Sequence, residues 1–316
     1  MNKLTVISPG PLSTIQDEGR FGYMSTGFSP GGAMDTYSMK IANILVGNAP
    51  GDGVIEMTLM GLSARFECNS VIALTGADME PTLNDKEIPM YKGIAVKKGD
   101  ILTLKMAKSG MRTYLAVAGG FDIEKAMGSM STNLKCALGG FEGRKLKAGD
   151  FLPLRASVDI FHIGTRKCAP ENKYENHITV RVVLGPQNDY FTKKGIETFL
   201  SSTYTVSDKS DRMGVRLDGE KIENINGVDI ISDGIATGSV QIPASGTPII
   251  MMADRQTTGG YAKIATVISA DLKKIAQAKP GSLISFEAVT AKEAVKLKRK
   301  EERKLKFLLY KMYFCK

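Results

Sequence analysis

The sequence predicts a mainly β protein with a few short helices, made of two domains and a helical tail. Three observations carry this prediction. Residues 54–154 read as short β-rich runs separated by glycine-bearing turns, which favours an antiparallel barrel or sandwich over alternating β and α units. A nine-residue phrase with glycine at its fourth position occurs at 96–104, 146–154 and 278–286. Residues 155–177 are polar and irregular, as expected of a linker.

The recurring phrase predicts the same kind of turn in both halves of the chain. Its three copies read VKKGDILTL, LKAGDFLPL and AKPGSLISF, and each predicts a turn followed directly by a strand. Two copies lie in the first half and one lies near the end of the second. This distribution indicates two domains with related β frameworks, although the phrase is too short to prove a duplication.

Few helices are expected in the first half. Residues 3–7 predict a short strand that ends before a Pro-Gly-Pro turn. Asp35 is a candidate N-cap for a helix with one apolar face, and the pair Gly47-Asn48 closes this helix. From residue 54 onward the β pattern dominates.

The second half is predicted to open with a strand that ends at Gly185-Pro186. A helix follows, from Asp189 or Thr192 to about Leu200. Two strands then flank a charged loop near Asp211. The body ends with a helix near 270–278 and a final strand with the sequence SLISFEAV.

The stretch 232–261 concentrates groups that suit chemistry. Its apolar segments 239–242 and 248–253 predict a strand, a turn and a second strand. A polar loop with Asp254, Arg255 and Gln256 follows, and Gly259-Gly260 is expected to form a turn. Arginine offers a planar fork of donors that suits a carboxylate or a phosphate.

These elements predict a first domain over 1–165, a second over 166–290 and a tail over 291–316. The tail combines many basic residues with apolar residues at i, i+3 and i+4 spacing from Leu305. We expect a solvated helix that packs one apolar stripe on its own domain. A helix that docks a partner or a membrane surface is the alternative.

Composition narrows the class of protein. The net charge is +9, but residues 292–316 hold ten Lys/Arg against three Glu and leave only +2 for the rest, which argues against a broad nucleic-acid-binding face. The four cysteines are far apart and form no metal or disulfide pattern, as in a reduced cytoplasmic protein. No signal sequence and no run of 18 apolar residues is present, so we expect a cytoplasmic chain that makes no contact with the membrane.

Several catalytic signatures are absent from the sequence. It contains neither a phosphate loop nor a dinucleotide-binding glycine motif. The two histidines, His162 and His177, lie in the predicted linker region, which argues against a Ser-His-Asp triad and a histidine-based metal site. No metal site is predicted, and no biotin attachment sequence is present. The catalytic residues stay unassigned.

Three polar loops, at 16–20, 211–214 and 254–261, each combine an arginine and an acid with a nearby glycine. One interpretation is an anion-binding cleft assembled from both domains. The other is that each Asp and Arg bonds to the other or to nearby carbonyls and holds the ends of the strands. The candidate ligand-binding residues are Gln16, Asp17, Arg20, Asp35, Asn48, Arg212, Gln241, Asp254, Arg255, Gln256, Gly259, Gly260 and Tyr261.

Several long segments together resemble one known family. They read GPLSTIQDEGRFGY, GGAMDTYSMKIANILVGN, LGPQNDYFT, SDRMGVRLDG and SDGIATGSVQIPASGTPIIMMADRQTTGGY, in this order. The chain resembles the family of allophanate hydrolase subunit 2, the Kip antagonist KipA and the C subunit of 5-oxoprolinase, also called the biotin-dependent carboxyltransferase A-B subdomain family. The resemblance covers residues 3–290, and it implies two cyclophilin-like β-barrel domains.

The resemblance implies three alternative functions. The first is the C subunit of a 5-oxoprolinase, which works with a KipI-like B subunit and with an A subunit to open 5-oxo-L-proline to L-glutamate using ATP. The second is a KipA-like regulator that binds a histidine-kinase inhibitor without catalysis. The third is the carboxyltransferase component of a biotin-dependent urea carboxylase system. We expect the first, with the isolated chain inactive. For a lactam that bears a carboxylate, Arg255, Arg212, Gln241 and Gln256 are the candidate contacts.

Overall fold

The computed structural model describes residues 2–155, 166–170 and 174–314 of the chain. These residues form two compact units. Unit 1 comprises residues 1–20, 31–174 and 304–316, and unit 2 comprises residues 21–30 and 175–303. The predicted domain boundary at 165/166 falls at the edge of residues that lie outside this description, and it stays a prediction.

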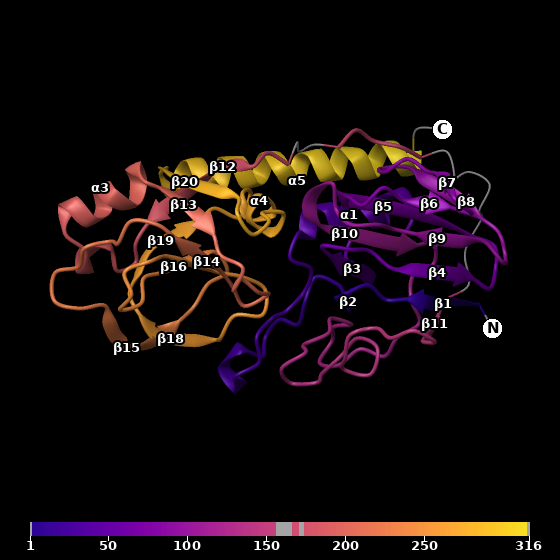
Figure 1. Ribbon diagram of the computed structural model, residues 1–316, viewed down its shortest axis with the longest axis horizontal. Coiled ribbons are helices and arrows are strands. Elements are labelled where there is room, and N and C mark those ends of the chain that lie inside the picture. The colour runs from indigo at the N-terminus through magenta and orange to yellow at the C-terminus, as the bar shows by residue number, and fades with distance from the viewer. Residues whose placement is uncertain (1, 156–165, 171–173, 315–316) are drawn as a thin grey trace. The chain divides into compact units, whose positions relative to one another are not determined.

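Unit 1 contains two antiparallel sheets (Figure 1). The strands of the first, in spatial order, are β11 (Phe151–Pro153), β1 (Lys3–Ser8), β4 (Ser63–Phe66), β9 (Ile101–Thr103), β6 (Thr82–Leu83) and β7 (Lys86–Glu87). The strands of the second are β2 (Ser13–Gln16), β3 (Val54–Thr58), β10 (Ser109–Val117), β5 (Ser70–Asp78) and β8 (Gly93–Val96).

The central strands β5 and β10 are buried on both faces. Successive side chains of a strand point to opposite faces, so Ile72 and Leu115 join the core shared by the two sheets, whereas Val71 and Tyr114 join a second cluster. Helix α1 (Thr36–Leu45) covers this second cluster. Almost all of β5 and β10 is buried, which explains their near-continuous apolar sequences.

Unit 2 is organised around a closed seven-stranded barrel, which antiparallel pairs form except where β12 pairs with β20 in parallel. Its strands, in order, are β12 (His177–Leu184), β19 (Lys263–Val267), β16 (Ser239–Gln241), β17 (Ile249–Met251), β14 (Gly214–Asp218), β13 (Thr203–Val206) and β20 (Leu283–Ala288). Strands β15 (Asp229–Gly234) and β18 (Thr258–Tyr261) form a separate two-stranded ribbon. The prediction of a mainly β fold is therefore confirmed.

The predicted short helices are present. Helix α1 begins after Asp35, whose side chain accepts a hydrogen bond from the Ser38 N–H at 3.0 Å, as predicted for an N-cap. Of the two predicted starts, Thr192 is the N-cap of α3 (Lys193–Ser201), whereas Asp189 lies in the 3-10 turn η2 (Asn188–Tyr190). Unit 2 also contains α4 (Leu272–Ala276) and the 3-10 turn η1 (Met24–Thr26).

The nine-residue phrase forms one structure in all three places. Its glycine, at position 99, 149 or 281, has a φ of 94°, 87° or 85°. In each copy this glycine N–H donates to a carbonyl of a neighbouring strand, at 2.7 to 2.8 Å, and the next residue's carbonyl accepts a bond back. The side chain of that next residue, Asp or Ser, accepts from a backbone N–H three residues earlier. The sequence similarity thus reflects a shared turn that pins each following strand.

The C-terminal helix α5 (Ala291–Phe314) starts where the tail was predicted to start. Thr290 and Glu293 form a reciprocal capping box at its first turn. The structure corrects one expectation: Leu305, Leu308 and Met312 pack against the α1 cluster of unit 1, and not on the second domain that precedes the tail. The cause is that α1 with β5 and β10 leaves an apolar surface that this stripe covers.

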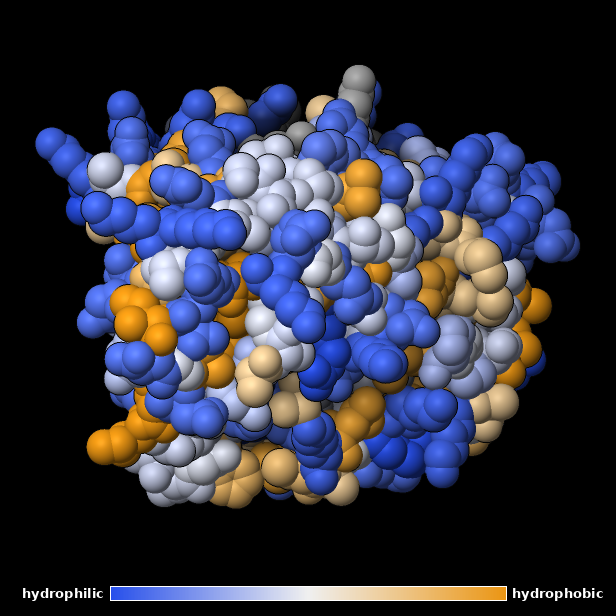
Figure 2. All heavy atoms as spheres, turned by 60° about the vertical axis from the view of Figure 1, so that its left-hand side comes forward, coloured by the Kyte–Doolittle hydropathy of each residue, from blue (hydrophilic) through white to orange (hydrophobic). Residues whose placement is uncertain are grey.

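Apolar side chains at the surface are scattered. Figure 2 shows them on one face as small patches among hydrophilic residues. The most exposed large one is Ile231, in the β15–β18 ribbon, at 95%. Among the described residues no helix is both long enough and apolar enough to cross a membrane.

The shared turn predicts a specific cost of substitution. A Cβ at Gly281 would meet no atom within 4 Å, but the φ of +85° disfavours any L side chain. We expect Gly281→Ala to reduce the free energy of unfolding by about 1–2 kcal/mol through backbone strain alone. Gly234→Ala is the matched control in the same unit, because a Cβ there also meets nothing and the backbone is ordinary. Calorimetric melting that shows equal effects for both variants would contradict this account.

Candidate functional site

The first predicted polar loop is used for local structure in unit 1. The Asp17 carboxylate accepts hydrogen bonds from the hydroxyls of Ser129 and Ser131, at 2.6 and 2.5 Å, and from the Met130 N–H at 2.6 Å. The Arg20 side chain is fully buried and donates to the Ser131 carbonyl. These bonds tie the loop to residues 129–131, more than a hundred positions away, so Asp17 and Arg20 hold this loop in place.

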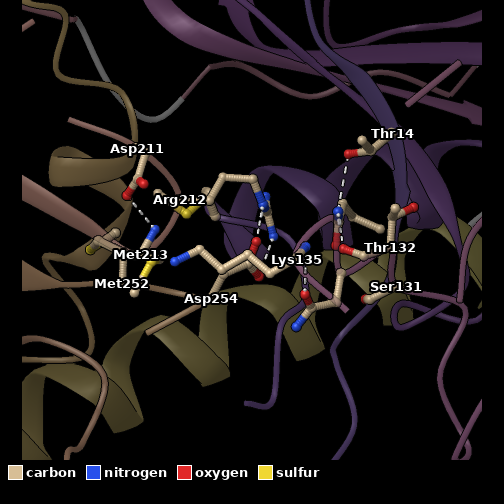
Figure 3. Close-up of polar contacts among 12 residues, drawn as sticks. Thr14, Ser131, Thr132, Lys135, Asp211, Arg212, Met213, Met252 and Asp254 are labelled. Carbon is tan, nitrogen blue, oxygen red and sulfur yellow. Dashed lines mark hydrogen bonds and ion pairs between the residues drawn. The ribbon is translucent and has the colours of Figure 1, made fainter. Parts of the chain in front are cut away.

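Gln16 lies beside them and leaves one atom unsatisfied. Its Nε2 donates to Thr14 Oγ1 at 3.0 Å and to the Thr132 carbonyl at 3.1 Å, and Figure 3 shows both Thr14 and Thr132. Its Oε1 is buried and accepts no hydrogen bond from any described residue. A buried amide oxygen of this kind often bonds an ordered water.

Asp35 and Asn48 also have structural partners. Asp35 caps α1, and its backbone N–H donates to the Tyr114 hydroxyl at 2.8 Å. Asn48 donates to the Val117 carbonyl at 2.9 Å and accepts from the Gly119 N–H at 2.9 Å, so it holds the end of α1 against the end of β10. Both side chains are buried.

Arg212 and Asp254 form a buried ion pair in unit 2. The Arg212 Nε and Nη2 groups donate to the two Asp254 carboxylate oxygens at 2.8 and 3.1 Å (Figure 3). The Asp254 N–H also donates to the Arg212 carbonyl at 2.9 Å. This pair joins the loop before β14 to the loop after β17, which fits the structural interpretation of these two residues.

Arg255, the next residue in sequence, is also buried, but its hydrogen-bond partners differ from those of Arg212. It is only 4% exposed, and it forms no ion pair with any described acid. Its Nε donates to the Ile235 carbonyl at 2.8 Å and its Nη1 donates weakly to the Met252 carbonyl at 3.4 Å. Burial lowers the pKa of Arg255 from its ordinary value. A guanidinium bound only to carbonyls keeps its full positive charge.

The other candidate residues of the predicted stretch differ in burial. Gln241 is buried, and its Nε2 donates to the Tyr261 carbonyl at 3.3 Å. Gln256 is exposed, and the Tyr261 side chain is partly exposed. Gly259 and Gly260 do not form the predicted turn, because they lie in β18, paired with β15. A Cβ on Gly259 would lie 2.6 Å from Ile235 and 2.9 Å from Gln241, so glycine here permits close approach of the ribbon.

The sequence did not single out a second cation, Lys263. Its side chain is 2% exposed, and its Nζ donates to Asp233 Oδ2 at 2.9 Å and to the Gly234 carbonyl at 3.4 Å. Gln187 accepts from the Lys263 N–H at 3.2 Å. Lys263 is the register partner of Gln241 across β16 and β19, so their side chains share one face. No sequence signal pointed to it, since Lys263 lies two residues beyond the last of the quoted family segments.

The candidate site of unit 2 is therefore defined by Arg255, Gln241, Lys263 and Asp233. Arg255 and Lys263 both bond to residues 233–235 at the end of β15. Asp233 neutralises Lys263, and Arg255 remains without a counter-charge from the described residues. Such a site suits one small anion with a neighbouring amide. No cluster of metal-ligating side chains occurs among the described residues.

Comparison with known families assigns this mainly β chain to one class. Residues 26–288 match the family described as "Carboxyltransferase domain, subdomain A and B", and the chain belongs to this family. This confirms the resemblance inferred from the quoted segments.

Two relatives have nearly the same length as this chain. The chain is 38% identical over 312 residues to the 5-oxoprolinase C subunit of Escherichia coli (strain K12), covering 98% of this chain and 99% of the relative. It is 42% identical over 296 residues to the 5-oxoprolinase C subunit of Haemophilus influenzae, covering 92% of each. The 98% coverage extends the similarity into the tail, beyond residue 290.

A solved structure shows the same fold inside a larger protein. The Kluyveromyces lactis urea carboxylase matches with a TM-score of 0.91 and 31% identity over 97% of this chain. The chain spans 29% of that protein. The fold assigned here is thus also found as one part of a longer carboxylase chain.

The buried pair predicts that Arg212 is structural. We expect Arg212→Ala to reduce the free energy of unfolding by about 3 kcal/mol, because it leaves the Asp254 carboxylate buried without its partner. The double variant with Asp254→Ala should recover part of that loss. Arg65→Ala, which breaks the exposed pair with Glu67, is the control and should cost less than about 1 kcal/mol. Equal losses for both arginines in denaturant unfolding would refute the structural assignment.

The Lys263–Asp233 pair predicts a pH effect. The side-chain hydrogen bond from Lys263, followed by the bond from the Gly234 N–H, holds the pKa of Asp233 below its ordinary value. The pair is therefore intact above the ordinary carboxyl range and is lost as the pH falls through the lowered pKa. NMR titration of the Asp233 carboxyl carbon should give a lowered pKa that rises in Lys263→Met. An unchanged pKa in that variant would show that the pair does not form in solution.

Proposed function

We propose that this chain is the C subunit of a multi-subunit 5-oxoprolinase. In this proposal it works with a KipI-like B subunit and with an A subunit in the ATP-dependent opening of 5-oxo-L-proline to L-glutamate. One observation carries the proposal: the match to two proteins named as the C subunit of 5-oxoprolinase runs nearly end to end in both chains. In the carboxylase relative, by contrast, the corresponding region is a minor part of a long chain.

The unit 2 site supports the substrate class. 5-Oxo-L-proline carries one carboxylate and one cyclic amide. The site offers one guanidinium without a counter-charge and the Gln241 side chain, which can both donate to and accept from an amide. The ion pair of Asp233 and Lys263 lies at the same end of β15 and adds no net charge.

ATP fits this candidate site poorly. A triphosphate requires several donors, such as the backbone N–H groups of a phosphate loop or a group of cations. The candidate site has one uncompensated cation, and its second cation is already paired with Asp233. We therefore derive no step through ATP from this chain, and we propose that one of the partner proteins holds it.

Reconstitution tests the proposed function. The chain should be combined with its matching A and B subunits, and ATP-dependent glutamate formation from 5-oxo-L-proline should be measured. We expect turnover with all three subunits and a loss of at least about 100-fold when this chain is omitted, as for other enzymes that lose a required part of the site. Full activity of the other two subunits alone would refute the proposal. Binding of a kinase inhibitor without turnover would instead favour the KipA-like regulator.

The carboxyltransferase alternative is favoured by a separate observation. The fold matches that of urea carboxylase at a TM-score of 0.91. This function requires biotin on a carrier protein and a biotin carboxylase, so it predicts carboxylation of urea when the chain is supplied with carboxylated carrier. The same preparation assayed with both substrates separates the two functions.

A further inference from the structure

Arg255 is an uncompensated charge in a place where charge is costly. Its side chain is 4% exposed, and burial already lowers its pKa. Buried charges in proteins are ordinarily paired with an opposite charge or with a full set of hydrogen-bond partners. Among the described residues Arg255 has neither, because its acceptors are two backbone carbonyls.

The neighbouring arginine shows what a purely structural arginine looks like here. Arg212 is equally buried, but two of its nitrogens bond the two oxygens of Asp254. Asp254 stands directly before Arg255 in sequence and yet pairs with Arg212. The acid next to Arg255 in sequence is therefore bound by another arginine and does not balance the Arg255 charge. The Nη2 group of Arg255 donates to no described residue.

We propose that Arg255 binds the carboxylate of a small monocarboxylic acid, with Nη2 as the principal donor and the Gln241 amide as a second contact. Ile235 is the residue that connects Arg255 with Gln241. The Ile235 carbonyl accepts from Arg255, and the Ile235 side chain and the Gln241 amide are the two nearest groups to the missing Cβ of Gly259. This inference rests on the proposed function only for the identity of the acid, because 5-oxo-L-proline is one such monocarboxylate.

The charges favour a carboxylate over a phosphate. Asp233 is 56% exposed and lies two residues from Ile235 along the chain, and its charge is already balanced by Lys263. One net positive charge remains, which matches one carboxylate. A phosphate dianion would bring a second negative charge close to Asp233 with no additional cation to meet it.

The test uses the full chain without its partner proteins and acetate as the minimal carboxylate. Thermal unfolding is followed in sodium chloride and in sodium acetate at equal ionic strength, for the wild type and Arg255→Met. Methionine has a similar length and no charge. In chloride the variant should melt at the same temperature or higher, because it removes a buried unpaired charge. Acetate should stabilise the wild type more than the variant, by ligand linkage.

Two comparisons sharpen the result. 5-Oxo-L-proline should bind the wild type at least about 10-fold more tightly than 2-pyrrolidinone, which lacks the carboxylate, and Arg255→Met should abolish this difference. Arg216→Met, at an exposed arginine of unit 2, is the matched control and should behave as the wild type in every salt.

The outcomes separate the possibilities. If Arg255→Met melts lower in chloride and responds to acetate as the wild type does, Arg255 only holds the Ile235 and Met252 carbonyls and the inference fails. A larger response to phosphate than to acetate also overturns it. Stabilisation by acetate that requires Arg255, together with no turnover in the reconstituted complex, supports the carboxylate site and refutes the 5-oxoprolinase assignment.

Discussion

The parallel pairing of β12 with β20 is the interaction on which unit 2 depends. These two strands are far apart in sequence, at 177–184 and 283–288, and their pairing joins the ends of the unit and closes the barrel. Closure fixes β19 between β12 and β16. Gln241 at the end of β16 and Lys263 at the start of β19 are therefore held opposite each other by the barrel itself.

Most of the polar side chains that the sequence suggested for ligand binding have structural partners. Asp17 holds residues 129–131, Asp35 caps α1, Asn48 bonds the end of β10, and Arg212 pairs with Asp254. These contacts show that the side chains hold local structure, and a ligand-binding role for them stays a prediction. Arg255 differs from Arg212, because both of its acceptors are uncharged backbone carbonyls.

Local sequence patterns were sufficient to predict the helices and turns, but not to predict which side chains bond to one another in the candidate site. The N-caps Asp35 and Thr192 and the repeated turn depend on residues close in sequence, so they could be predicted. The pairing of Asp254 with Arg212 could not be predicted, because Arg212 lies 42 residues away in sequence and Arg255 is the direct neighbour of Asp254. Gly259-Gly260 was predicted as a turn, because its pairing with β15 joins residues that are far apart in sequence. Glycine is needed at position 259 because Ile235 and Gln241 leave no room for a Cβ. Lys263 gave no signal because a lone lysine is ordinarily exposed.

The candidate site lies at the end of β15, in the separate two-stranded β15–β18 ribbon. Its two strands pair only with each other among the described strands, and Ile231 within it is almost fully exposed. At its base, Lys263 bonds Asp233 and Gly234, and Arg255 bonds the next carbonyl. Lys263 therefore ties the ribbon to the barrel through a charged pair, whereas Arg255 adds only bonds to uncharged carbonyls. In the proposed site, a ligand carboxylate would be the group that balances the Arg255 charge.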